Sequence, residues 1–201
     1  MSETFGHRGP WIQTRSGKKF YYLTSGFNDV EILDIAHGLA FTCRWMGQCS
    51  SFYSVAQHSV LLSLVVPKEI AFYALLHDAS EAYLGDLCTP LKNTIEIGNG
   101  YKKMEERIQN LIEHKFNVQV PLSFDYFKSL DSGMAAAEAK VLGLDLYRED
   151  EGWLAAGEPV PIRINPWTPE NSKRAFIKRF HDLDGRREEQ GKFLADSGMY
   201  W

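Results

Sequence analysis

Two histidines and two aspartates lie in apolar stretches of the sequence, where a charged group needs a partner. His77 and Asp78 are adjacent in the run ALLHDASEA, His58 lies in VAQHS, and Asp131 follows FKSL. An ionised carboxylate that is buried without a partner costs several kcal/mol, so it is usually paired or bound to a cation. Imidazole nitrogen and carboxylate oxygen together suit Mn²⁺, Fe²⁺, Co²⁺, Zn²⁺ or Mg²⁺. The four residues therefore predict a divalent-metal site, without choosing among these ions.

Taken singly, each of these residues also has a structural interpretation. A lone histidine on an apolar helix face is usually a hydrogen-bonded core residue, and an inward aspartate can cap a helix or pair with arginine. Four such residues on three helices are better explained by a shared cation. A second His-Asp pair, His181-Asp182, lies at a helix end among charges and is interpreted as helix-terminal polar structure. For Asp34 and His37, three residues apart, we favour a capping or core hydrogen bond over a metal site.

The elements that must position these residues are helices, because apolar residues recur at helical spacing along most of the chain. Caps and prolines set the expected boundaries. The expected helices run from an N-cap at Asn28 or Asp29 to Cys43, from Ser54 to Val66, from Lys68 to Leu84, from Asn99 to Phe116, from Ser123 to Leu144 and from Glu170 to about His181. Residues 86–91 and 149–169 are expected to be connections, and Phe20–Leu23 a short extended piece or turn. Little else is typical of strand, so we predict an all-α domain.

Helical spacing also predicts which side chains share a face. In a continuous third helix, His77 and Glu81 project on the apolar side, and Asp78 lies on the neighbouring apolar stripe. Asp131 lies on a similar stripe of a later helix, and His58 aligns with apolar residues of an earlier one. Three separate helices thus each direct a potential ligand inward.

Three longer strings carry a resemblance to a known family. VAQHS, LHDASEA and GDLCTPLK resemble the HD-domain metal-dependent phosphohydrolases, above all the small bacterial 5′-deoxynucleotidases and their phage and prophage relatives. An isolated His-Asp dipeptide is a weak signal, whereas this extended pattern is specific. The resemblance covers about residues 30–145 and implies an HD-domain helical bundle.

The resemblance implies roles for the polar residues in these strings. Four residues match the family's metal ligands: His58, His77, Asp78 and Asp131. Glu81, one turn beyond the His-Asp pair, resembles the acid that positions or deprotonates the attacking water. Asp86 resembles a second acid near the leaving group. Both are therefore expected to be catalytic.

Substrate contacts are implied for three further residues. Arg44-Trp45 matches a pair that contacts the phosphate and the sugar or base, and Lys92 matches a phosphate-side lysine. Arginine grips phosphate with two donors, and lysine acts as a point charge. Glu138 shares a helical stripe with Asp131 and is interpreted as a partner for Arg44 or for a ligand histidine.

The resemblance implies a divalent-metal phosphohydrolase that acts on a small-molecule nucleotide. The leading substrate is a deoxyribonucleoside 5′-monophosphate, hydrolysed to nucleoside and phosphate. One alternative hydrolyses a deoxynucleoside triphosphate such as dATP and releases triphosphate, as some phage and bacterial relatives do. That reaction needs more positive charge around the pocket, for which Lys102, Lys103 and Arg107 are candidates. A second alternative, from another class, is a non-catalytic nucleotide-binding HD protein.

Composition indicates the partners and the cellular compartment that we expect for this protein. A net charge of −4, from 22 basic and 26 acidic residues, argues against binding to nucleic acid. Cys43, Cys49 and Cys88 lack Cys-x-x-Cys spacing, so neither a disulfide framework nor a zinc ribbon is expected. No signal peptide or membrane-spanning run is visible. We expect a cytoplasmic protein, in a bacterium or in the host of a phage.

Length favours one domain. The 201 residues suit a single HD phosphohydrolase domain over residues 1–201, with a core at about 29–145. Residues 1–28 are expected to form an N-terminal extension and residues 146–201 a C-terminal one. Family resemblance and the apolar C-terminal residues suggest a homodimer or higher homo-oligomer.

Overall fold

The described part of the protein is mostly helical, which confirms the predicted all-α fold class. The computed structural model describes residues 8–144 and 158–185. A small antiparallel hairpin, with Ile12 paired to Phe20, precedes the helices. In chain order the elements are β1 (Trp11–Gln13), β2 (Lys19–Tyr21), η1 (Phe27–Asp29), α1 (Ile32–Phe41), η2 (Trp45–Gly47), α2 (Val55–Val65), η3 (Lys68–Ile70), α3 (Ala71–Leu76), α4 (Glu81–Leu84), α5 (Thr89–Lys92), α6 (Ile95–Phe116), α7 (Phe124–Val141) and α8 (Pro169–Asp184).

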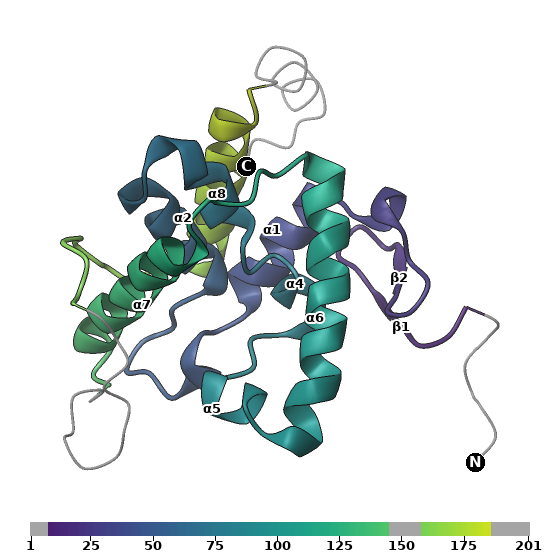
Figure 1. Ribbon diagram of the computed structural model, residues 1–201, viewed down its shortest axis with the longest axis horizontal. Coiled ribbons are helices and arrows are strands. Elements are labelled where there is room, and N and C mark those ends of the chain that lie inside the picture. The colour runs from purple at the N-terminus through teal and green to yellow at the C-terminus, as the bar shows by residue number, and fades with distance from the viewer. Residues whose placement is uncertain (1–7, 145–157, 186–201) are drawn as a thin grey trace.

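Helix α2 lies at the centre of the core. Its first nine residues are all buried, and it packs against α1, α3, α7 and α8. Ser54 caps the helix by accepting a hydrogen bond from Gln57 N at 3.1 Å, and the helix ends before Pro67, as predicted. Figure 1 shows α6 and α7 on opposite sides in this view, with α1, α2 and α4 between them. A polar side chain on α2, such as His58, is therefore enclosed by other helices.

The predicted continuous helix over residues 68–84 is wrong. The chain forms a 3₁₀ turn, then α3, then a tight turn at His77–Ser80, and then α4. The side-chain amide of Gln109, on α6, holds this tight turn. It donates to Leu76 O at 2.9 Å and accepts from Ser80 N at 3.2 Å. Because these bonds come from a distant helix, the local sequence gives no sign of the break.

Other boundaries differ from the predicted ones by a few residues. Helix α1 begins after Glu31 and not after Asn28 or Asp29, because the Asp29 carboxylate accepts a backbone N–H in the preceding 3₁₀ turn. Helix α6 starts at Ile95, four residues before the predicted start, and α5 occupies part of the connection expected at 86–91. Tertiary packing, which propensity does not include, decides such ends.

The hairpin supports α4 from outside the bundle. Phe20 is fully buried and stacks on Tyr83, with ring centroids 4.1 Å apart. Tyr22 Oη donates to Tyr83 O at 3.0 Å. These aromatic residues thus belong to the core. Among the described residues, no helix is long and apolar enough to cross a membrane. Much of the connection expected at 149–169 lies outside the described residues.

Candidate metal centre

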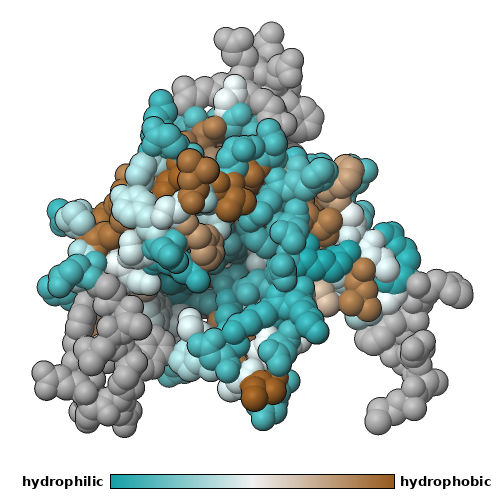
Figure 2. All heavy atoms as spheres, in the orientation of Figure 1, coloured by the Kyte–Doolittle hydropathy of each residue, from teal (hydrophilic) through white to brown (hydrophobic). Residues whose placement is uncertain are grey.

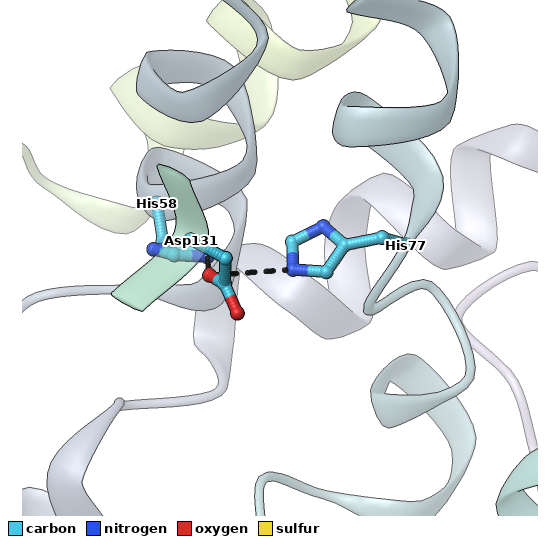
Figure 3. Close-up of side chains that lie close together, drawn as sticks. All are labelled: His58, His77 and Asp131. Carbon is cyan, nitrogen blue, oxygen red and sulfur yellow. Dashed lines mark ion pairs between the residues drawn. The ribbon is translucent and has the colours of Figure 1, made fainter. Parts of the chain in front are cut away.

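The four predicted metal ligands come together from three parts of the chain. His58 lies on α2, His77 and Asp78 lie in the turn after α3, and Asp131 lies on α7. Asp131 Oδ1 is 3.1 Å from His58 Nε2 and 3.8 Å from His77 Nε2. Asp78 Oδ2 is 3.2 Å from His77 Nε2 and 3.8 Å from His58 Nε2. Figure 3 shows both imidazole rings directed toward the Asp131 carboxylate.

The other nitrogen of each imidazole has an acceptor beside it. His58 Nδ1 lies 2.6 Å from Glu138 Oε1, and His77 Nδ1 lies 2.9 Å from Ala74 O. Since both partners are acceptors, each Nδ1 carries a proton and each Nε2 is the nitrogen that faces a ligand. Both Nε2 atoms are buried and have no hydrogen-bond partner among the described residues. Two such nitrogens facing two carboxylates fit a divalent cation.

The carboxylates favour positive charge at the histidines. Burial and the Arg44 charge lower the pKa of His58, but Glu138 and Asp131 outweigh them and raise it to about 10. Burial also lowers the pKa of His77, and its neighbouring carboxylates raise it above the ordinary value. The site is therefore suited to hold a cation, either a proton or a metal ion.

Arg44 connects two of the carboxylates around this site. Its Nε donates to Glu138 Oε2 at 3.1 Å, and its Nη1 lies 3.6 Å from Asp78 Oδ2. The side chain is only 14% exposed. Nη1 thus lies beside Asp78, where an anionic group bound next to a metal ion would meet it.

Arg44 precedes a turn with unusual backbone geometry. Trp45, Met46 and Gly47 all have positive φ, at 60°, 53° and 73°. Left-handed backbone at two non-glycine residues is strained and persists only where the surrounding structure enforces it. Here Arg44 N donates to Tyr53 O at 2.8 Å, which closes the loop that carries the turn. The fold thus maintains strain at Trp45, which together with Arg44 is predicted to contact substrate.

Glu81 lies beside this cluster at the start of α4. Its side chain is buried; Oε1 accepts from Lys92 Nζ at 3.2 Å, and Oε2 has no hydrogen-bond partner among the residues described. Burial first, and then the charges of Asp78 and Asp86, raise the Glu81 pKa well above its ordinary value. Lys92 Nζ also donates to Glu105 Oε1 at 2.7 Å. A buried carboxylate oxygen with a raised pKa is suited to accept a proton.

Asp86 lies half-buried in the loop after α4. Burial and the charge of Asp78 raise the pKa of Asp86, and the charges of Arg44 and Lys92 lower it. The net effect is a pKa above the ordinary value. The structure thus brings Asp86 within electrostatic range of the other predicted site residues.

Sequence comparison places the chain among known proteins. A family described as 5′-deoxynucleotidase YfbR-like matches residues 48–142. The chain is 41% identical over 182 residues to the uncharacterized protein YfdR of Escherichia coli, covering 89% of this chain and 98% of that relative. It is also 34% identical over 192 residues to an uncharacterized protein of Rhodobacter capsulatus, covering 86% and 95%. The chain belongs to the YfbR-like family of HD-domain phosphohydrolases.

Membership of the YfbR-like family confirms the predicted resemblance and implies a divalent metal. In the described part of the chain, His58, His77 and Asp131 are a group able to hold one, with ligand atoms within 4.8 Å of one another. Asp78 approaches both histidines of this group. Both histidine Nε2 atoms of this group face the carboxylates of Asp78 and Asp131.

The sequence favoured structural roles over metal binding for Asp34, His37 and His181, and each lies among other contacts of the fold. Asp34 accepts hydrogen bonds from Ser16 N and Ser16 Oγ, both at 2.7 Å. His37 lies against Phe41, with ring centroids 4.5 Å apart. His181 lies near the end of α8, as expected for helix-terminal structure.

Sequence reasoning missed two residues that contact the surroundings of the candidate site. Glu105 shares Lys92 with Glu81, and Gln109 holds the turn that carries His77. Both lie on α6, whose alternation of apolar and charged residues predicts a surface helix. Their spacing of four residues places them on one face of the helix. This spacing was the signal in the sequence that could have identified them.

Proposed function

We propose that this chain is a divalent-metal-dependent 5′-deoxynucleotidase, which hydrolyses deoxyribonucleoside 5′-monophosphates to nucleoside and phosphate. The observation that carries the proposal is the convergence of the buried Nε2 atoms of His58 and His77 with the carboxylates of Asp78 and Asp131, at distances of 3.1 to 3.8 Å. These four residues would hold the metal. When bound, a divalent ion lowers the pKa of water and neutralises charge on phosphoryl oxygens.

The chain's own residues supply the remaining steps. Glu81 takes the proton of the attacking water on Oε2, while Lys92 holds its other oxygen in place. Asp86, whose pKa burial raises, gives a proton to the leaving 5′-oxygen. Arg44 and Lys92 bind the phosphoryl oxygens, and Trp45 contacts the sugar or base.

The charges near the site favour a monophosphate over a triphosphate. Of the cations left open by the sequence, Lys102 donates to Asn93 Oδ1 at 3.0 Å, and Arg107 donates to Ser25 O at 2.7 Å, next to η1. Arg44 and Lys92 are the cations that form ion pairs with candidate site carboxylates within the part of the chain described. A phosphate monoester carries about −1.5 to −2 charges at pH 7, and a triphosphate carries more. Two cations and a divalent ion suit the smaller charge.

A product assay tests this proposal against its alternatives. The purified protein meets ribo- and deoxynucleoside mono-, di- and triphosphates with Mn²⁺, Co²⁺ or Mg²⁺, beside Asp78→Ala and the exposed control Asp125→Ala. We expect orthophosphate from deoxynucleoside monophosphates, lost in Asp78→Ala and retained in Asp125→Ala. Triphosphate release would assign the triphosphohydrolase reaction, and a metal-bound protein inactive on the whole panel would support a non-catalytic binding protein. The single domain over residues 1–201, the cytoplasmic location and the homodimer stay predictions.

A further inference from the structure

Glu138 is fully buried on α7, two helical turns beyond Asp131, and its two oxygens have different partners. Oε1 lies 2.6 Å from His58 Nδ1, and Oε2 accepts from Arg44 Nε at 3.1 Å. The phenol of Tyr53, also fully buried, lies close enough that the Glu138 charge adds to burial in raising its pKa. One carboxylate thus contacts both a candidate metal ligand and a candidate phosphate ligand.

We propose that Glu138 is a positioning residue that couples metal binding to phosphate binding. Through Oε1 it holds the His58 ring with Nε2 toward the metal position, and through Oε2 it aims the Arg44 guanidinium at the phosphate position. The inference rests on the proposed function, because it assigns metal and phosphate to these two partners. Glu138 itself contacts neither substrate nor metal.

The chemistry of the pair requires a carboxylate at this position. Both His58 Nδ1 and Arg44 Nε are donors, so their shared partner must offer two acceptor oxygens. A glutamine amide offers one oxygen and one NH₂ group, so Glu138→Gln leaves one of the two donors facing another donor. A buried donor left without an acceptor is destabilising and moves away from its position. Partners of metal-binding histidines typically change metal affinity or activity by about 10- to 100-fold when replaced.

Asp34 provides a matched control for this substitution. It is a nearly buried carboxylate on α1 that also accepts two hydrogen bonds, both from Ser16. Asp34→Asn therefore removes the same charge and the same kind of acceptor, but at a position outside the candidate site. A loss that follows merely from disturbing a buried carboxylate should occur in both variants.

The test uses Mn²⁺ alone and inorganic phosphate as probes. Calorimetric titration should show Mn²⁺ binding weakened by about 10- to 100-fold in Glu138→Gln and unchanged in Asp34→Asn. At saturating Mn²⁺, inorganic phosphate should inhibit nucleotide hydrolysis less strongly in Glu138→Gln than in the wild type. Equal Mn²⁺ affinity and equal phosphate inhibition in Glu138→Gln and wild type would overturn the inference and leave the proposed function intact. Failure of the wild type to bind Mn²⁺ would overturn both.

A measurement on the wild type covers the case in which Glu138→Gln does not fold. In the Zn²⁺-loaded protein, long-range ¹H–¹⁵N correlation of the His58 ring should show a proton on Nδ1, shifted downfield by the short hydrogen bond to Glu138. A ring bound to zinc through Nδ1, with its proton on Nε2, contradicts the role of Glu138 whatever the fate of the variant.

Discussion

Replacing Glu81 by glutamine tests whether its unpartnered oxygen takes the proton of the attacking water. The substitution keeps the size of the side chain and leaves the four candidate metal ligands intact, so Mn²⁺ binding should persist. General-base catalysis contributes about 10²- to 10⁴-fold to a rate, or about 3–5 kcal/mol of barrier. We expect kcat for deoxynucleoside monophosphates to fall by a factor in this range, with a small change in KM.

The pH profile gives this prediction a second, independent readout. A general base must be deprotonated, so kcat/KM of the wild type should rise as pH increases through the raised Glu81 pKa. That limb should lie at higher pH than an ordinary glutamate allows, and Glu81→Gln should lack it.

Glu105→Gln is the matched control, because Glu105 is the other carboxylate that accepts from Lys92, at 2.7 Å. It removes the charge of the second carboxylate beside Lys92 and leaves the proposed base in place. Steady-state kinetics with Mn²⁺ should give Glu105→Gln a kcat within a few-fold of the wild type. The assignment of Glu81 is refuted by a Glu81→Gln enzyme that is almost as active as the wild type. It is equally refuted by a Glu105→Gln variant that loses as much activity as Glu81→Gln.

Three further predictions concern the metal and the packing around it. Mn²⁺ at 100 times its Kd should stabilise the fold by about 2.7 kcal/mol and raise Tm by about 5–10 °C. Chelation should reverse this stabilisation. A melting curve that Mn²⁺ does not shift contradicts a metal site in the folded chain. Mn²⁺ affinity should increase from pH 6 to pH 8, because protons on His58 and His77 compete with the ion. The pKa of His58 is raised to about 10, and that of His77 is also raised. A constant affinity in calorimetry argues against these ligands. Gly98→Ala should destabilise by about 1–3 kcal/mol in urea unfolding and raise KM, because its Cβ would lie 2.0 Å from Lys92 O. Gly100→Ala, with nothing within 4 Å of its Cβ, should do neither, and equal effects of the two changes would contradict this account.

The structure brings the four predicted metal ligands together, but it presents two of them on a backbone that differs from the predicted helix. His58, His77, Asp78 and Asp131 stand out because charged side chains in apolar runs are buried and need partners, and the structure does bring them together. The predicted helix that carried two of them is broken, because Gln109 from α6 satisfies backbone groups at the break.

Long-range pairs explain the rest of what the sequence left open. Glu138 could be suspected as a partner from its helical stripe alone, but whether it serves Arg44 or a histidine depends on how α7 packs, and it serves both. The pairing of Lys92 with Glu105 depends likewise on how α5 lies against α6. Local periodicity predicts that a residue faces inward, and only the packed fold determines which residue it meets.

The bonds of Glu138 also bear on the order in which the chain acquires its site. They connect Glu138 on α7 to His58, which lies 80 positions earlier in the chain, and to Arg44, which lies 94 positions earlier. During synthesis the two histidines therefore leave the ribosome well before the helix that supplies Asp131 and Glu138. Closing such long loops costs chain entropy, so contacts of this kind form late in folding. We expect a nascent chain to hold Mn²⁺ tightly only after α7 has docked, so that metal uptake marks a late step of folding.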